Sequence, residues 1–332
     1  MSISYPERGS ENPLDSNENL LLPDHYYKDI KDEIDFDLGI YPSPTSKELK
    51  KRLARFYELN PEQVVVDNGS DAVLDTICKT FIPKYGTLGY FHPSYEMYSF
   101  LASRNDRKAL EIPLNPDFTL PTKKDYLNEV DAVFICSPNN PSGLAVDQKK
   151  IRSILDEAEL VVIDEAYAEY SNEDNLSLLE EYDNLIIVRT FSKAWGLAGI
   201  RVGYALMPAE RGIEYLENML PFNVNSMSSK VALTALDKKS QVQESINKTI
   251  KERERLSKKL EDIGFNPFPS DTNFLLCKKP AFIEISKLHK ELLDRGIRIR
   301  IFEEPRLKDH VRITVADRKT NDHLLEILEE IL

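Results

Sequence analysis

Hydrophobic positions recur along this chain with two different spacings, and each spacing predicts one kind of secondary structure. Leu49, Leu53 and Phe56 lie three or four positions apart, which is the spacing of one face of an α-helix. The segments that follow predict, in order, a strand at 64–66, a helix over 70–81, a strand at 88–91 and a helix over 95–103. This alternation continues to about residue 207.

Three further strands are predicted from runs that are apolar at nearly every position, at 133–136, 160–163 and 185–188. Such runs are typical of strands that are buried on both faces of a parallel sheet. We therefore expect the α/β fold class, with a large, doubly wound and mostly parallel sheet.

The pattern changes after Pro221 and predicts a second, smaller α+β lobe. A helical stretch at 226–236 leads into a long, charged helix over 241–260. Shorter elements follow, with strands at 273–277, 297–301 and 311–315 and helices at 282–295 and 321–332. The domain organisation we expect is an N-terminal arm that joins the small domain (1–27), a large domain (28–238) and a small C-terminal domain (239–332).

The charge of the chain limits the kinds of partner it can have. Its 332 residues include 43 Lys and Arg against 56 Asp and Glu, for a net charge of −13 at pH 7. A nucleic-acid backbone repels such a chain, so we expect no nucleic-acid partner. No stretch approaches the roughly 18 apolar residues of a membrane helix, and the N-terminus lacks the apolar run of a signal peptide. We expect a cytoplasmic protein with no membrane partner.

Cysteines and histidines give no sign of a metal site. The three cysteines, Cys78, Cys136 and Cys277, are far apart and lie in apolar runs, which favours free core thiols over disulfides or zinc ligands. The five histidines form no H-x-x-x-H pair. We expect no metal.

Polar side chains that can act as acids, bases or nucleophiles follow three of the predicted buried strands. Lys193 follows the strand at 185–188, Asp164 and Tyr167 follow the strand at 160–163, and Asn140 follows the strand at 133–136. Because ligands of open α/β sheets bind at the carboxyl ends of the strands, we expect these side chains in one crevice. An acid, an amide, a phenol and an amine together suit a pyridine ring that carries a phenolic oxygen and an aldehyde. Each feature alone also fits an ordinary loop.

With these motifs the chain resembles the fold-type I pyridoxal-phosphate aminotransferases over nearly its whole length, and among them it is most similar to the histidinol-phosphate aminotransferases. The motifs are TFSKAWGLAGIR at 190–201, DEAY at 164–167 and SPNNPSG at 137–143. The resemblance implies that Lys193 forms the imine with pyridoxal 5'-phosphate and that Asp164 pairs with the pyridinium nitrogen. It also implies that Asn140 and Tyr167 bind the ring oxygen.

The resemblance extends to a cradle for the cofactor phosphate. Gly69, Ser70 and Asp71 lie where a strand gives way to a helix, and the free N–H groups of a helix N-terminus bind anions. A carboxylate repels phosphate, so we expect Asp71 to contribute only its backbone. Ser192 and Arg201 match family positions that bind the phosphate oxygens, and a guanidinium suits that anion.

Two tyrosines are assigned by resemblance alone. Tyr95 matches the residue whose ring stacks on the pyridine face. Tyr41 is similar to a tyrosine that reaches the cofactor phosphate of the neighbouring subunit. This second match implies a homodimer with shared active sites.

The substrate side is also assigned by resemblance. Arg312 is similar to the arginine that binds the substrate's carboxylate or phosphate, with Arg300 assisting and Asn19 beside the substrate. Asn19 stands where several family members have an aromatic residue, and Ala316 stands where glycine is usual. The loop over 303–309 has no evident counterpart.

The activity that the resemblance implies is transamination, with histidinol phosphate and 2-oxoglutarate as substrates in histidine biosynthesis. Aromatic amino-acid aminotransferases and phosphothreonine-type decarboxylases share the ring-binding residues and remain alternatives. A non-catalytic cofactor-binding regulator usually carries a DNA-binding domain, and only about 25 residues precede the core motifs here. Nucleotide binding is disfavoured because neither G-x-x-x-x-G-K-[ST] nor G-x-G-x-x-G occurs.

Overall fold

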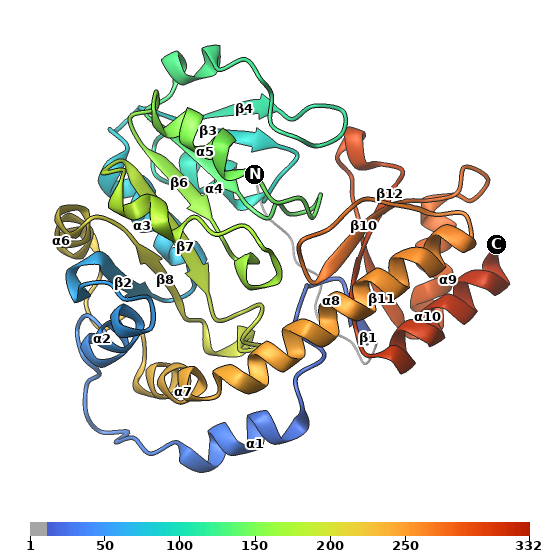
Figure 1. Cartoon of the computed structure of the whole chain (residues 1–332), viewed down its shortest axis with the longest axis horizontal. Coiled ribbons are helices and arrows are strands. Elements are labelled where there is room, and N and C mark those ends of the chain that lie inside the picture. The colour runs from blue at the N-terminus through green and yellow to red at the C-terminus, as the bar shows by residue number, and fades with distance from the viewer. Residues whose placement is uncertain (1–11) are drawn as a thin grey trace.

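Two sheets form two lobes in the computed structural model, which describes residues 12–332 (Figure 1). The larger sheet has seven strands in the order β2-β8-β7-β6-β5-β3-β4. Their bounds are β2 Val64–Asp67, β3 Thr87–His92, β4 Lys108–Pro113, β5 Ala132–Cys136, β6 Val161–Asp164, β7 Leu185–Thr190 and β8 Gly203–Leu206. β8 runs antiparallel to β2 and β7, and the other paired strands are parallel. The expected fold class is confirmed.

Helices cover both faces of the large sheet because side chains alternate between the faces along each strand. Val64 and Val66 pack in one hydrophobic cluster, whereas Val65 between them packs in another. The first cluster includes residues of α2 Lys47–Phe56, α5 Gln148–Leu155 and α7 Ser226–Asp237. The second includes residues of α3 Ser70–Phe81, α4 Met97–Arg104 and α6 Ala209–Asn218. This is the doubly wound arrangement.

The smaller sheet has five strands in the order β1-β11-β12-β10-β9. Their bounds are β1 Asn12–Leu14, β9 Asn266–Pro267, β10 Phe274–Lys278, β11 Ile297–Ile301 and β12 His310–Thr314. Helices α9 Ile285–Asp294 and α10 Arg318–Ile331 pack on this sheet around their own hydrophobic cluster. β1 pairs in parallel with β11, so the chain enters through the small lobe before it builds the large one.

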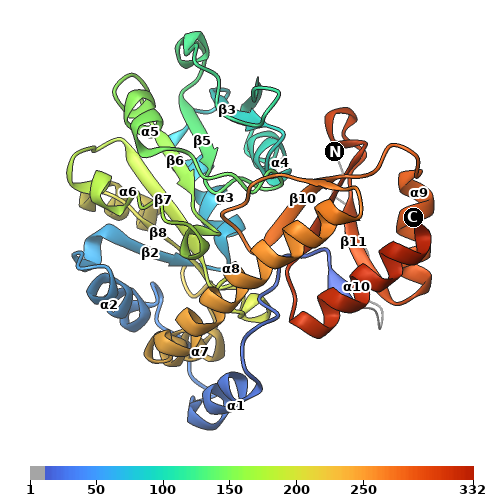
Figure 2. The ribbon, with the colours of Figure 1, turned by 45° about the vertical axis from the view of Figure 1, so that its right-hand side comes forward.

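Two helices join or border the lobes. α8 Lys239–Asp262 follows α7 below the large sheet and runs to the small lobe (Figures 1 and 2). α1 Asp24–Glu33 lies beside α7. The remaining short helices are η1 Pro61–Gln63, η2 Asp125–Glu129, η3 Ala168–Tyr170, η4 Leu176–Glu180, η5 Ala198–Ile200 and η6 Pro305–Leu307.

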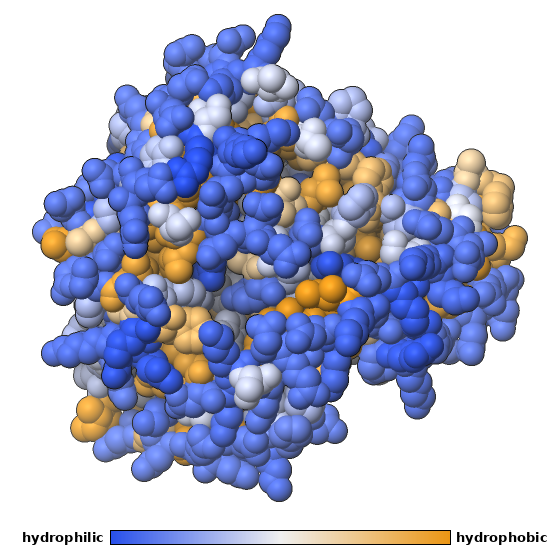
Figure 3. Space-filling view, in the orientation of Figure 1, coloured by the Kyte–Doolittle hydropathy of each residue, from blue (hydrophilic) through white to orange (hydrophobic). Residues whose placement is uncertain are grey.

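The face shown in Figure 3 is mainly hydrophilic, with separate apolar patches. Within residues 12–332, no helix combines the length and apolar character needed to cross a membrane.

Candidate active site

A cavity of about 310 Å³ opens at the carboxyl ends of the large sheet's central strands, where the small lobe faces them. Most of the side chains singled out in the sequence line this cavity: Ser70, Asp71, Tyr95, Asn140, Asp164, Tyr167, Ser192, Lys193, Arg201, Arg300 and Arg312. The segment 15–18, which follows β1, closes one side. The cavity size is that of a small-molecule site.

Lys193 lies in the loop after β7, and its amine is largely enclosed. Its Nζ donates a hydrogen bond to the carbonyl oxygen of Ser16 at 2.9 Å and lies 5.6 Å from the centre of the Tyr167 ring. Burial, together with the nearby positive charge of Arg312, lowers the pKa of Lys193 to about 8. A lysine with this pKa is neutral in about a tenth of the molecules at pH 7, far more often than an ordinary lysine.

Asp164 ends β6 and is buried. Its Oδ2 accepts a hydrogen bond from the Tyr98 hydroxyl on α4 at 2.8 Å, and its Oδ1 accepts one from the Ala166 backbone N–H at 3.2 Å. Burial raises the pKa of Asp164 to about 6, although these two hydrogen bonds act in the opposite direction. The carboxyl group is therefore mainly ionised at pH 7, in surroundings where a cation beside it is strongly favoured.

Tyr167 and Asn140 are held by residues from outside the large sheet. The Asn17 side-chain amide donates to the Tyr167 hydroxyl at 2.9 Å. Arg312 on β12 donates to the Asn140 Oδ1 and to the backbone carbonyl of Asp15. Since the amide oxygen of Asn140 faces this arginine, its N–H groups point elsewhere and can donate to a ligand.

Arg312 also carries a charge into the cavity. Its side chain is buried, and burial lowers its pKa to about 10. A guanidinium with this pKa still keeps its charge at neutral pH and can accept an anion.

The start of α3 forms a compact anion-binding corner. Gly69 has φ +85°, a conformation that strains any residue with a Cβ, and a Cβ added there would lie 2.7 Å from the Arg201 Nη2, so the guanidinium would have to shift. The Asp71 carboxylate accepts hydrogen bonds from Arg201 at 3.3 Å and from the Tyr95 hydroxyl at 2.9 Å. Arg201 and the α3 N-terminus offset the negative charge of Asp71, which leaves the backbone N–H of Ser70 for an anion.

Ser192 completes this corner from the loop after β7. Its Oγ accepts hydrogen bonds from the Thr190 hydroxyl at 3.0 Å and from Arg201 Nη1 at 3.5 Å. Below it, a Cβ added to Gly203 would lie 2.2 Å from the Ser70 backbone nitrogen. The β8 backbone thus packs directly against the turn at Gly69 and Ser70, where β2 gives way to α3.

Two of the expected site residues lie elsewhere. The side chain of Tyr41 is 82% exposed, and its ring centre lies 5.2 Å from that of Phe222. Asn19 is buried outside the cavity lining: it donates to the Ala194 carbonyl oxygen at 2.7 Å and accepts from the Ser245 hydroxyl at 2.9 Å. In this structure Asn19 supports the loop that carries Lys193.

Three cavity residues were not foreseen: Glu96, His92 and Glu304. Glu96 Oε1 lies 3.1 Å from Arg300 Nη2, and Glu304 Oε1 lies 3.5 Å from His92 Nε2, so both pairs link the two lobes at the cavity. These contacts join residues far apart in sequence, and no local pattern could have indicated them.

Comparison with known proteins gives the family of this chain. The sequence model of the family "Aminotransferase class I and II" matches residues 9–328. The chain is 38% identical over 330 residues to the histidinol-phosphate aminotransferase of Caldanaerobacter subterraneus subsp. tengcongensis, and the match covers 96% of this chain and 92% of that protein.

Solved structures share the fold. The histidinol-phosphate aminotransferase of Clostridium acetobutylicum superimposes with a TM-score of 0.86 at 27% identity, covering 96% of this chain and 98% of that one. The histidinol-phosphate aminotransferase of Sinorhizobium meliloti, solved in complex with pyridoxal-5'-phosphate, has a TM-score of 0.86 at 24% identity, covering 96% and 90%.

Proposed function

Because this chain belongs to the class I and II aminotransferases, we propose that it transfers an amino group from histidinol phosphate to 2-oxoglutarate, with pyridoxal 5'-phosphate as cofactor. The products are imidazole-acetol phosphate and glutamate, in a step of histidine biosynthesis. The observation that carries this proposal is one cavity that holds an amine with lowered pKa, Lys193, and a buried acid, Asp164. The relatives that carry the histidinol-phosphate aminotransferase name, at 37–38% identity, support the choice of substrate.

The residues present fit the cofactor. The N-terminus of α3, with Ser192 and Arg201, offers hydrogen-bond donors and positive charge to a phosphate group. Gly69 keeps this corner open, because a Cβ there would fill the space beside the guanidinium. Asp164 would hold the ring nitrogen, Asn140 and Tyr167 the ring oxygen, and Tyr95 would lie against the ring.

The catalytic roles follow from protonation states. When bound, pyridoxal phosphate supplies an aldehyde that accepts the amino group and a pyridinium ring that takes up electrons from the substrate carbon. Asp164, ionised at pH 7, stabilises positive charge on the group beside it. Lys193, in its neutral form, accepts a proton at Nζ and returns it to a neighbouring carbon.

Substrate binding falls to the small lobe. Arg312 lies in the cavity with its charge intact and can fork onto either a phosphate or a carboxylate, so one side chain can serve both substrates. Arg300 would assist from β11, where Glu96 now pairs with it.

We also propose a homodimer with shared active sites, in which Tyr41 reaches the neighbouring cofactor phosphate. Exposed apolar side chains near Tyr41 support this: Leu38, Ile40 and Phe222. The proposed domain division remains 1–27, 28–238 and 239–332, of which residues 1–11 lie outside the described part. As a biosynthetic enzyme, the protein is expected in the cytoplasm.

A substrate panel tests the proposal. Purified protein with pyridoxal phosphate and 2-oxoglutarate is assayed with histidinol phosphate, phenylalanine and phosphothreonine. We expect the highest kcat/KM with histidinol phosphate. Equal or better turnover of phenylalanine would identify an aromatic amino-acid aminotransferase instead, and release of carbon dioxide from phosphothreonine would identify a decarboxylase.

A further inference from the structure

A buried ion pair lies behind the active site, on the opposite face of the large sheet. Asp164 turns toward Tyr98 and the second hydrophobic cluster, so the next residue, Glu165, faces the other side. Glu165 is 1% exposed and Arg189 is 9% exposed. Arg189 donates from Nε at 2.9 Å and from Nη2 at 2.7 Å to the Glu165 Oε2.

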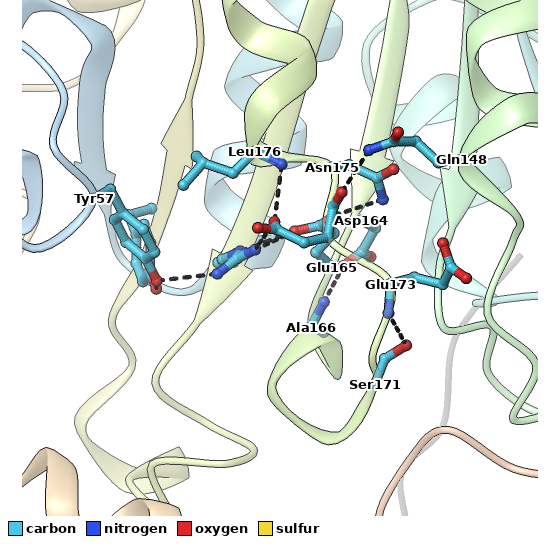
Figure 4. A network of polar contacts seen from close by, with 12 residues as sticks. Tyr57, Gln148, Asp164, Glu165, Ala166, Ser171, Glu173, Asn175 and Leu176 are labelled. Atoms are coloured by element: carbon cyan, nitrogen blue, oxygen red, sulfur yellow. Dashed lines mark hydrogen bonds and ion pairs between the residues drawn. The ribbon is translucent and has the colours of Figure 1, made fainter.

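Neighbouring groups fix the pair further (Figure 4). The Asn175 amide donates to the Glu165 Oε1 at 2.9 Å, so both carboxylate oxygens are engaged. Arg189 Nη1 donates to the Tyr57 hydroxyl at 3.3 Å, which itself lies 2.6 Å from the hydroxyl of Tyr204. Tyr57 directly follows α2, Arg189 lies in β7, Tyr204 lies in β8, and Glu165 and Asn175 follow β6.

Two further carboxylates face the guanidinium. Asp174 Oδ1 lies 3.7 Å from Arg189 Nη2, in an exposed position. Burial raises the pKa of Glu169, and the charge of Arg189 opposes that effect. Arg189 is therefore the cation that balances the carboxylates described around it.

The pair bridges the two strands that present the reactive groups. β6 and β7 are adjacent and parallel, and Glu165 N–H donates to the Val188 carbonyl oxygen at 2.8 Å. Glu165 directly follows Asp164, and Arg189 precedes Lys193 by four positions. Along the backbone, the ion pair thus lies one residue from Asp164 and four residues from Lys193.

Stability alone does not explain two charges in this place. Removing a carboxylate and a guanidinium from water costs free energy, and apolar residues of similar volume often stabilise a fold as well or better. Two charge-assisted N–H groups of one guanidinium that converge on a single carboxylate oxygen, with Asn175 on the other oxygen, do, however, fix the distance between the two strands. The charge of Arg189 also offsets that of Glu165, which otherwise would raise the pKa of Asp164 further.

We propose that Glu165 and Arg189 are positioning residues that clamp β6 to β7 and so hold Asp164 and Lys193 at their working separation. This rests on the roles of Asp164 and Lys193 in the proposed function. The clamp acts through the backbone of both strands, and neither of its side chains touches the cavity lining.

The test measures how fast the Lys193 amine of the cofactor-free protein reacts with an aldehyde. Pyridoxal, which lacks the phosphate, is added between pH 6 and 10, borohydride fixes it, and mass spectrometry measures its rate of attachment to Lys193. The variants are Glu165→Gln, which keeps the size but loses the negative charge, and Arg189→Lys, which keeps the positive charge but loses the pair of N–H donors to Glu165 Oε2. The matched control is Glu181→Gln, which breaks an exposed forked pair with Arg152. Kinetics of the cofactor-loaded proteins and thermal unfolding are measured in parallel.

We expect both clamp variants to fold and to attach pyridoxal at least about ten-fold more slowly than the wild type, since small displacements of reacting groups cost rates of this order. The kcat should fall by a similar factor while KM changes less than about two-fold, because the arginines proposed to bind substrate lie in the other lobe. The Glu181→Gln protein should match the wild type.

Attachment rates and kcat equal to those of Glu181→Gln would overturn the clamp, and so would failure of both clamp variants to fold. A Lys193→Ala protein separates the two proposals. If the total attachment of pyridoxal to this protein, over all of its lysines, proceeds at the wild-type rate, the proposed function fails. If it does not, while Glu165→Gln behaves as wild type, only the clamp fails.

Discussion

Burial shifts the pKa values of Lys193 and Asp164 in opposite directions, because their ionised forms carry opposite charges. Burial disfavours any charged form, so it lowers the pKa of the amine to about 8 and raises that of the acid to about 6. The acid therefore changes protonation just below neutral pH and the amine just above it. This is the range in which proton transfer in either direction is inexpensive.

The pKa of Lys193 gives a testable pH dependence. Only the neutral amine reacts with an aldehyde, so the rate at which cofactor-free protein binds pyridoxal phosphate should rise with pH through about 8. Arg312 lowers this pKa by repulsion, so Arg312→Met should move the midpoint to higher pH. Stopped-flow absorbance measures the rates. A midpoint that stays in place, or that moves as much in an Arg211→Met control on α6, would contradict this account.

Gly203 gives a second prediction at the residue scale. A methyl group there would lie 2.2 Å from the Ser70 backbone nitrogen, so Gly203→Ala must displace the start of α3. Overpacking of this kind costs about 1–3 kcal/mol, and we expect the affinity for pyridoxal phosphate to fall by about ten-fold or more. Gly199→Ala is the control, because nothing lies within 4 Å of its added Cβ. Titration of absorbance gives both dissociation constants, and equal values would refute the supporting role of β8.

The sequence indicates the reactive residues better than it indicates the residues that hydrogen-bond to them. Lys193, Asp164 and Asn140 each follow an apolar strand, and parallel strands present their carboxyl ends at one edge, so their meeting can be predicted. Asn17 and Tyr98 bond to the site from β1's loop and from α4, and their positions depend on packing between distant segments. No local spacing contains that information.

At the scale of elements, β1 connects the small lobe to the chemistry. Leu14 is fully buried among the side chains of α8, α9 and β12, and the residues that follow it supply the carbonyl of Ser16 and the amide of Asn17 to the cavity. The strand is only three residues long, yet the buried side chain of Leu14 anchors it and so positions Ser16 and Asn17 beside the cavity.

Leu14→Ala should therefore weaken both stability and the site. Removing this buried side chain is expected to lower the free energy of unfolding by about 2–5 kcal/mol, through lost burial and the cavity left behind. Chemical denaturation measures the change, and cofactor affinity should fall with it. The Phe282→Ala control changes a side chain that is 72% exposed and should have little effect. Similar stability of the two variants would show that β1 is not held as described.

Two strands show where sequence patterns fail. β4 is an edge strand, and its exposed charged residues Lys108 and Glu111 break the apolar run that marks a buried strand. β8 has four residues beginning with Gly203, directly after the Lys193 motif, and it reads as a continuation of that loop. Both strands are set by pairing with another strand, β4 with β3 and β8 with the distant β2, and not by their own residue pattern.

At the scale of the whole molecule, the exposed apolar side chains around Tyr41 indicate a partner surface. Tyr41, Leu38 and Ile40 are more than half exposed, although large apolar side chains are usually covered. Covering them with a second copy would bring Tyr41 to a neighbouring site, as the proposed homodimer requires.

The double variant Ile40→Asp, Tyr41→Asp should shift the protein from dimer to monomer and weaken cofactor binding, because charge at this surface opposes burial. Light scattering after size exclusion measures the mass. Tyr85→Asp is the control, since Tyr85 is 67% exposed and lies outside this patch. A wild-type monomer, or a dimer that survives the double substitution, would exclude this surface as the interface.

The most direct measurement locates the cofactor on the chain. Protein loaded with pyridoxal phosphate is reduced with borohydride and digested, and the modified peptide is sequenced by mass spectrometry. We predict a single pyridoxyl group on Lys193, with none on a Lys193→Ala protein. Attachment to another of the lysines, or no attachment to protein that has full activity, would contradict the account.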